Sequence, residues 1–242
     1  MQNNKFHYCL HILPILFFMA FVSASCIKDD LSDCPAPRTS GFSLQVKAFD
    51  ADGGSLGSET IKDITLYIFD ADKALLDTRN ILLSEIVFLD YPGHDNLKLV
   101  AWGNGKQGAQ SMPALKEGDH LETSVVALIQ TRTTYPVAGS PDDLFYGTID
   151  ITPDADASAK ELPLRRKVSG VAITARYLRE YVGSTEGEYH YIVRKTTDKL
   201  DFYGKPNGTE VNYRPQAAFN DNGEFVSSAF NKFPTAAAIK LD

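Results

Sequence analysis

The sequence predicts an all-β protein built from two tandem β-sandwich domains. Short runs of alternating or β-branched residues recur along the chain with turn residues between them, and few segments have a helical period. Strands at this spacing indicate sandwiches. We place the domains at residues 41–160 and 161–242, because residues 152–160 are rich in Pro, Asp and Ser. About 80 residues is small for a closed sandwich, so the second domain is expected to be incomplete or to take a strand from a partner.

The expected strands of the first domain follow from their residue pattern. Phe42–Phe49 alternates apolar and polar residues and ends in the turn sequence Asp50-Ala-Asp-Gly-Gly54. Ile64–Phe69 is a run of β-branched and aromatic residues, which favour strands. The remaining strands are expected at Leu75–Thr78, Leu97–Trp102, Thr123–Thr131 and Phe145–Ile151.

The second domain is expected to begin with a long strand. Leu162–Ala175 reads as extended, with a bulge near Gly170. Further strands are expected at Tyr189–Arg194 and Thr209–Tyr213. The segments that look helical are Ser111–Gly118 and Ala175–Tyr181.

The first 25 residues are typical of an export signal. Ile12–Val22 is an apolar run that is too short to cross about 30 Å of hydrocarbon as a helix, and small residues follow it. Ser23-Ala24-Ser25-Cys26 resembles a lipoprotein cleavage site, although the usual Leu three places before the Cys is absent. We therefore expect cleavage before Cys26, lipid on its thiol, and a flexible polar tether at residues 26–40. The alternative is an ordinary secreted protein in which Cys26 forms a disulfide.

Charge and cysteine content limit the partners. Loss of residues 1–25 removes one Lys and no acid, so the net charge changes from −7 to −8. An acidic chain without a basic run is poorly suited to nucleic acid or to an anionic bilayer, so membrane attachment is expected to depend on lipid. With Cys26 lipidated, Cys34 is the one remaining mature cysteine, which excludes an intrachain disulfide. Cys34 is then a free thiol or pairs with another chain.

Motifs for catalysis or cofactor binding are weak. The mature histidines His94, His120 and His190 are far apart in sequence, and a surface position is expected for each. Gly103-Asn-Gly-Lys-Gln-Gly108 lacks the phosphate-loop pattern and is interpreted as a hairpin turn. The pairs Asp50/Asp52 and Asp70/Asp72 lack the further ligands of a calcium loop and are interpreted as turn residues. We expect no metal, no cofactor and no enzyme activity, although paired carboxylates of a glycosidase remain open.

Several segments together resemble the FimB/Mfa-type fimbrial anchor lipoproteins of Gram-negative anaerobes. The start of the mature chain, Cys26-Ile-Lys-Asp-Asp-Leu-Ser-Asp-Cys-Pro35, is similar to the lipidated start of that family. The other matching segments are Ile64-Thr-Leu-Tyr-Ile-Phe-Asp-Ala-Asp72, Leu99-Val-Ala-Trp-Gly-Asn104, Ser140-Pro-Asp-Asp-Leu-Phe-Tyr-Gly147 and Leu164-Arg-Arg-Lys-Val-Ser-Gly-Val171. The matches become sparse after residue 171, and family members usually continue beyond the length of this chain.

This resemblance implies two tandem transthyretin-like β-sandwiches and a lipid-held position on the outer face of the outer membrane. It implies that Lys28, Asp29 and Asp30 form the signal for export to the surface; the alternative is that these charges only solvate the tether. The implied partners are fimbrial (pilin) subunits, and the implied role is anchoring or assembly of fimbriae.

The hypothesis for subunit contact is strand pairing. A sandwich with an unfilled edge exposes N–H and C=O groups that a strand of a partner can satisfy. The rival hypothesis is a surface glycan-binding lipoprotein, which would present aromatic residues to sugars. Trp102 is the single Trp, and we expect it in the core. An enzyme is the third alternative.

Overall fold

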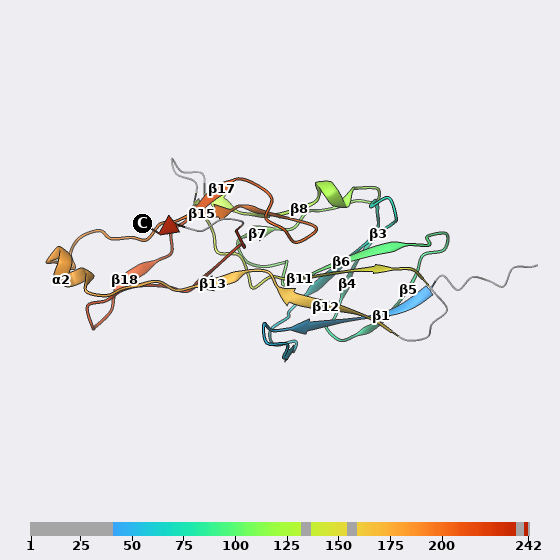
Figure 1. Cartoon of the computed structure of the whole chain (residues 1–242), viewed down its shortest axis with the longest axis horizontal. Coiled ribbons are helices and arrows are strands. Elements are labelled where there is room, and N and C mark those ends of the chain that lie inside the picture. The colour runs from blue at the N-terminus through green and yellow to red at the C-terminus, as the bar shows by residue number, and fades with distance from the viewer. Residues whose placement is uncertain (1–40, 132–136, 154–158, 236–239, 242) are drawn as a thin grey trace, which may run out of the picture. The chain divides into compact units, whose positions relative to one another are not determined.

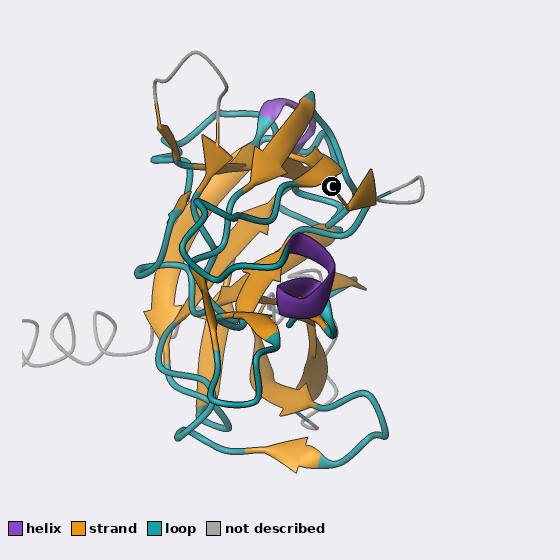
Figure 2. Cartoon of the chain, turned by 90° about the vertical axis from the view of Figure 1, so that its left-hand side faces the viewer, coloured by secondary structure: helices purple, strands orange, loops and turns teal. Residues whose placement is uncertain are grey.

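The computed structural model confirms an all-β chain. It describes residues 41–131, 137–153, 159–235 and 240–241. In these ranges strands dominate, and the helical elements are a 3₁₀ turn, Leu121–Thr123, and the short helix α2 (Leu178–Val182) (Figure 2). The described residues contain no helix that is both long enough and apolar enough to cross a membrane.

The largest element is an eight-stranded sheet (Figure 1). Its spatial order is β2 (Ser55–Leu56), β1 (Gly41–Phe49), β12 (Lys160–Arg166), β11 (Phe145–Ile151), β6 (Leu97–Gly103), β3 (Ile64–Phe69) and β4 (Leu75–Ile81). The eighth strand, β5 (Ile86–Asp90), pairs with the first half of β1, on the side opposite β12. The pair β1–β12 is parallel, and the other pairs of this sheet are antiparallel.

The central strands of this sheet are buried on both faces. In β3, Leu66 and Ile68 enter one core cluster, whereas Tyr67 and Phe69 enter another. In β6, Leu99 and Ala101 join the first cluster, and Val100 and Trp102 join the second. Because successive side chains of a strand point to opposite faces, a continuous apolar run is what a strand covered on both sides requires.

Four smaller sheets contain the remaining strands. The five-stranded sheet has the order β21 (Lys240–Leu241), β15 (Val193–Thr197), β17 (Glu210–Tyr213), β10 (Val137–Ala138) and β9 (Gln130–Thr131). Two three-stranded sheets have the orders β16 (Lys199–Asp201), β8 (Val125–Leu128), β7 (Gln110–Ser111), and β14 (Thr174–Ala175), β19 (Phe225–Ser227), β18 (Ala217–Phe219). The last sheet pairs β13 (Ser169–Val171) with β20 (Phe230–Lys232).

Segments on the two sides of residue 160 share sheets and a core. Leu200 of β16 pairs with Val126 of β8, and β17 pairs with β10. The ring of Phe202 packs edge-on against Tyr67, with 5.0 Å between ring centroids, and lies 6.1 Å from Trp102. The division into domains at residue 160 stays a prediction. The core cluster that contains Tyr67, Trp102 and Phe202 includes residues from both predicted domains.

Most expected strands are present, and the structure differs from the prediction in several places. The helix expected at Ser111–Gly118 is absent: its first residue pairs with β8, and Met112 and Leu115 pack on the core from a segment without regular secondary structure. The long strand expected at Leu162–Ala175 is divided among β12, β13 and β14, which lie in three sheets. The strand expected at Tyr189–Arg194 begins only at Val193, and β5 was not anticipated.

Candidate functional site

The residues predicted to carry lipid and the export signal lie outside the described part of the chain. These are Cys26 and the charges Lys28, Asp29 and Asp30; Cys34 lies there too. Their roles stay predictions. The candidate site is therefore built from the described residues after Gly41.

Within the described ranges, no group of three or more His, Cys, Asp or Glu side chains is placed to hold a metal. Instead, the aspartates interpreted as turn residues close turns. An Asp50 carboxylate oxygen accepts hydrogen bonds from the backbone N–H groups of Asp52 (3.0 Å) and Gly54 (2.6 Å). Asp70 accepts one from the N–H of Ala74 (2.9 Å). These carboxylates stabilise strand ends, as short polar side chains commonly do.

Trp102 lies in the core, as expected. Its side chain is 0% exposed, and its ring packs against Tyr146 with 4.9 Å between centroids. The side chain is therefore not available to stack on a sugar.

The segments that carried the family resemblance meet at one end of neighbouring strands. Asn104, directly after β6, is 5% exposed; its amide accepts a hydrogen bond from the N–H of Lys62 (2.7 Å) and donates to the carbonyls of Thr60 and Asp143 (2.9 Å each). The Asp143 carboxylate pairs with the Arg166 guanidinium at 2.7 Å. These motif residues therefore join β6, β11 and β12, and their role is structural.

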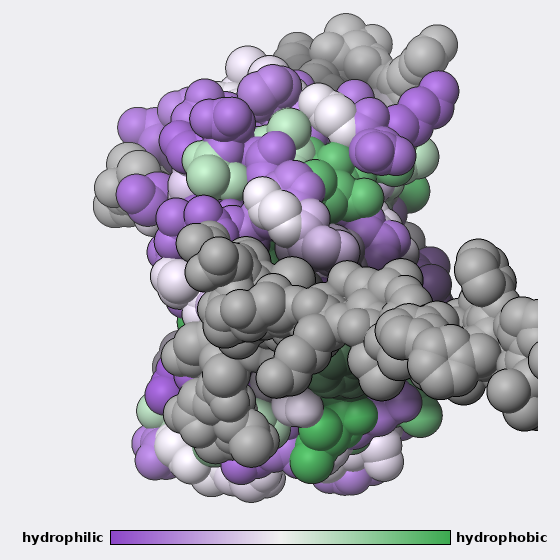
Figure 3. All heavy atoms as spheres, turned by 90° about the vertical axis from the view of Figure 1, so that its right-hand side faces the viewer, coloured by the Kyte–Doolittle hydropathy of each residue, from purple (hydrophilic) through white to green (hydrophobic). Residues whose placement is uncertain are grey.

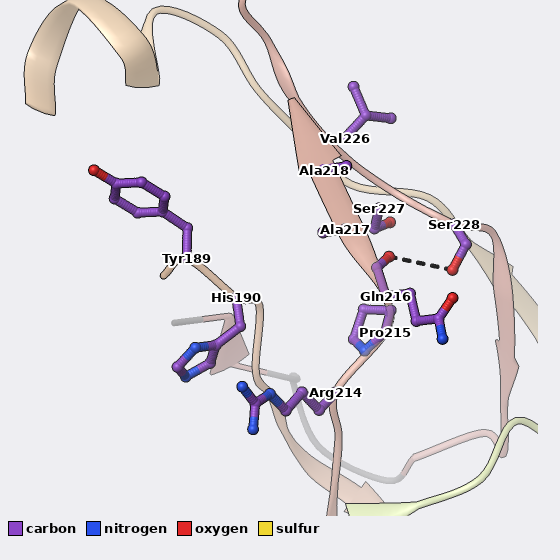
Figure 4. A pocket seen from close by; sticks show the side chains of 10 residues that line it. All are labelled: Tyr189, His190, Arg214, Pro215, Gln216, Ala217, Ala218, Val226, Ser227 and Ser228. Carbon is purple, nitrogen blue, oxygen red and sulfur yellow. Dashed lines mark hydrogen bonds between the residues drawn. The ribbon is translucent and has the colours of Figure 1, made fainter. Parts of the chain in front are cut away.

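A hollow beside β18 is the best candidate for a binding site (Figure 4). It has a volume of about 610 Å³ and is open to solvent. Its lining residues are Tyr189, His190, Arg214, Pro215, Gln216, Ala217, Ala218, Val226, Ser227 and Ser228. A second hollow of about 430 Å³ shares Tyr189, Ala217 and Ala218 with it and extends to Phe219. We call the two together the edge groove.

The hydrogen bonds of β18 define which backbone groups face away from β19. Asn220 donates to the carbonyl of Glu224 (2.9 Å), and Ser228 donates to that of Gln216 (2.8 Å). Because hydrogen-bonded and non-hydrogen-bonded pairs alternate in an antiparallel ladder, Ala218 is the bonded position between them. The N–H and C=O groups of Ala217 and Phe219 therefore point away from β19, and among the described strands β18 pairs with β19 alone.

The side chains around the groove leave the strand accessible. Ala217 and Ala218 carry only methyl groups, and Ala218 is exposed. Tyr189 packs its ring edge-on against Phe219, with 5.6 Å between centroids, on one side of the groove. The polar side chains of His190 and Arg214 lie close together at one end of the groove, whereas that of Gln216 points away from them (Figure 4).

The Tyr191 hydroxyl forms hydrogen bonds with β14 and β19, the two strands of this three-stranded sheet that lie beyond β18. The N–H of Ala175 donates to the Tyr191 hydroxyl (2.9 Å), which in turn donates to the carbonyl of Phe225 (2.6 Å). The hydroxyl thus bridges β14 and β19. Burial raises the pKa of Tyr191, so the hydroxyl keeps the proton that it donates.

The edge groove was not predicted from the sequence. One signal was available: Pro215 directly precedes the short run Gln216-Ala-Ala-Phe219. Proline cannot donate to a ladder and is confined in sheets largely to edges and strand starts. The run is too short for its alternation to have been recognised as a strand.

Residues 31–241 match the protein family described as fimbrillin-A associated anchor proteins Mfa1 and Mfa2. The chain is 26% identical to a protein of Porphyromonas gingivalis named major fimbrium anchoring subunit FimB, over 99% of this chain and 80% of that one. The fold is similar to that of the fimbrial anchor protein Mfa2 from the same species (TM-score 0.65, 15% identity, 83% and 75% of the two chains covered). A Bacteroides thetaiotaomicron protein of the DUF1812 group, proposed to bind polysaccharides, is also similar (TM-score 0.67, 17% identity, 83% and 74% covered).

Proposed function

Because the chain belongs to the family of fimbrillin-A associated anchor proteins Mfa1 and Mfa2, we propose that it is a surface lipoprotein that anchors or helps assemble a fimbrium. Lipid on Cys26 holds it in the outer membrane, and a strand of a fimbrial subunit pairs with β18. The observation that carries the second half is the unfilled edge, where Ala217 and Phe219 present N–H and C=O groups away from β19.

A lipid anchor fits the acidic charge of the chain. The net charge is negative, and the described residues contain no membrane-spanning helix. At about 0.8 kcal/mol per buried CH₂, two or three acyl chains contribute tens of kcal/mol, far more than a few Lys side chains could. Lys28, Asp29 and Asp30 then direct the lipidated protein to the outer face.

Strand addition at β18 explains how a subunit could be held without a covalent bond. The backbone of an added strand satisfies the exposed groups of Ala217 and Phe219, and its alternate side chains enter the edge groove. An added strand would lie about 4.8 Å from β18, and the methyl groups of Ala217 and Ala218 leave room for its side chains. The relatives are named as anchor proteins, and holding a subunit in this way needs no catalytic step.

The anchor is tested by replacing Cys26. We expect Cys26→Ala to move the protein from the membrane fraction to the soluble fraction; continued membrane residence would contradict lipidation. With Cys26 intact, we expect Asp29→Ala/Asp30→Ala to leave the protein in the membrane but shielded from protease added to whole cells. Unchanged cleavage would reject the export signal.

The edge is tested by proline substitution at an outward-facing position. Ala217→Pro removes the N–H group that points into the groove and should leave the β18–β19 ladder intact. Gln216 precedes the site and lies against Ser228 in an extended chain, so the restriction that proline places on its neighbour is already met. We expect Ala217→Pro to lose co-purification with sheared fimbriae and Ala217→Ser, the matched control, to retain it.

Two further outcomes of this experiment are informative. If Ala217→Pro unfolds the protein, as seen by circular dichroism, Ala218→Arg offers a second block, because Ala218 is exposed at the groove. If folded Ala217→Pro and Ala218→Arg both co-purify with fimbriae at the level of the natural protein, β18 is not the attachment edge.

A further inference from the structure

Exposed apolar side chains are concentrated in one segment of the described chain. Leu82 is 69% exposed, Ile86 61% and Phe88 65%. They make up half of the large apolar side chains that are exposed in the described ranges. We call these three residues the apolar strip. Scattered exposed apolar residues are ordinary, but a cluster indicates a surface that meets something other than water.

The backbone holds the apolar strip in place. A turn at residues 82–85 is closed by Glu85, whose N–H donates to the carbonyl of Leu82 (3.3 Å) and whose carboxylate accepts from the N–H of Leu82 (3.0 Å). In β5, Leu89 is fully buried, so the strand alternation directs Ile86 and Phe88 outward. Ile86 and Phe88 are therefore exposed because they alternate along β5 with Leu89, which packs in the core.

Phe88 lies over the first residue of β1. A Cβ built on Gly41 would come within 2.1 Å of the Phe88 ring, so the ring occupies the space that a side chain at residue 41 would need. Ser43 is the register partner of Phe88, and Gln45 is that of Ile86. Phe88, at one end of the apolar strip, is therefore adjacent to the point at which the chain enters the sheet.

The surroundings of the apolar strip carry no cationic cluster among the described residues. The residues of β1 that lie opposite Phe88 and Ile86 are the neutral Ser43 and Gln45, and the Gln45 amide donates to the carbonyl of Ser84 (2.8 Å). The nearest Lys along β1, Lys47, pairs with Glu161 at 2.5 Å. The partner that fits such a surface is apolar rather than acidic.

The number of residues between Cys26 and Gly41 limits the distance between this surface and a lipid on Cys26. Residues 26–40 are fifteen residues, which extended span at most about 50 Å. If Cys26 carries lipid, Gly41 and the adjacent Phe88 stay within about that distance of the bilayer. Figure 3 shows hydrophobic side chains in the upper right and in the lower part of the face that it views. Apolar side chains near an acyl anchor can enter the boundary between headgroups and hydrocarbon.

We propose that Leu82, Ile86 and Phe88 insert into the surface of the membrane to which Cys26 is attached, so that two contacts set the orientation of the protein. This inference rests on the proposed lipidation of Cys26. The insertion is shallow and hydrophobic, and it leaves the edge groove, which belongs to another sheet, free for a fimbrial subunit.

The test places an environment-sensitive fluorophore at position 86. In a Cys34→Ser background, Ile86→Cys is labelled in the lipidated mature protein bound to phosphatidylcholine vesicles. Ile129→Cys is the matched control, because Ile129 is exposed to a similar degree (55%) and lies outside β5 and its turn. We expect a blue-shifted, brighter emission and reduced access to a water-soluble quencher at position 86 on vesicles, and no change at position 129.

The possible outcomes distinguish membrane insertion of the apolar strip from lipidation of Cys26. Equal quenching at positions 86 and 129 in vesicle-bound protein would overturn membrane insertion while leaving the lipid anchor intact. A blue shift at position 86 without vesicles would also overturn it, since residues 26–40 or a second copy would then cover the apolar strip. Failure of the purified natural protein to bind vesicles would instead overturn lipidation.

Discussion

Asn104 offers the sharpest test of how the family motifs hold the fold. Its backbone lies in the left-handed region at φ +59°, and its buried amide makes three hydrogen bonds, to the backbone groups of Lys62, Thr60 and Asp143. Asn adopts this conformation more readily than most residues, whereas Ala is strained there. Asn104→Ala therefore removes three hydrogen bonds and adds backbone strain.

The expected loss is about 4 kcal/mol in the free energy of unfolding. Each lost hydrogen bond costs about 1 kcal/mol net, and leaves a buried N–H or C=O group without that partner. The left-handed backbone adds about 1 kcal/mol for Ala. For a chain of this size the loss corresponds to a fall of roughly 8–16 °C in Tm.

The assay is urea unfolding of the mature protein without lipid (Cys26→Ala), followed by circular dichroism. Asn104→Gly is the matched control, because it loses the same hydrogen bonds but accepts a positive φ, and we expect it to be about 1 kcal/mol more stable than Asn104→Ala. The m-value should stay constant, as it does when only stability changes. A loss below about 1 kcal/mol for Asn104→Ala would refute the reasoning.

Three other predictions follow from buried polar groups. Tyr191→Phe should lower stability by about 1–3 kcal/mol, because it removes the hydroxyl that bridges β14 and β19, and hydrogen exchange should increase in those strands; unchanged exchange would count against the bridge. Burial raises the pKa of Tyr67 and of Tyr146 to about 12, so the folded protein retains protons that the unfolded chain loses from pH 10 upward. Stability should therefore fall between pH 10 and pH 12, with phenolate absorbance appearing together with unfolding; phenolate formation at pH 10 in folded protein would contradict this. Trp102→Phe should cost less than about 2 kcal/mol by urea unfolding, since the indole N–H has no partner among the described residues, whereas Trp102→Ala should cost about 3–5 kcal/mol; equal losses would disagree with this account.

The residue pattern predicted strands best where the pattern lies entirely within one strand. Phe42–Phe49 and Phe145–Ile151 were identified to within a residue, because alternation in a strand reports directly which side faces a core. The apolar runs Ile64–Phe69 and Leu97–Trp102 were also recognised, and the structure explains their lack of alternation by burial on both faces.

The differences arise where long-range pairing overrides local pattern. Met112 and Leu115 have a helical spacing, yet the adjoining Gln110 and Ser111 pair with β8, and the chain continues over the core without regular secondary structure. Leu162–Ala175 reads as one strand, but its parts pair with β1, β20 and β19 in turn. Strand partners far away in sequence leave no trace in a local window.

By itself, the sequence determined the all-β class, most central strands, the core position of Trp102 and the resemblance to fimbrial anchors, because each depends on local periodicity or on contiguous motifs. Only the tertiary structure decided that the motifs meet through Asn104 and Asp143, that β18 has an unfilled edge, and that Ile86 and Phe88 face outward beside Gly41. The physical reason is that an edge, a groove or an exposed strip is defined by which distant segments pair and which do not.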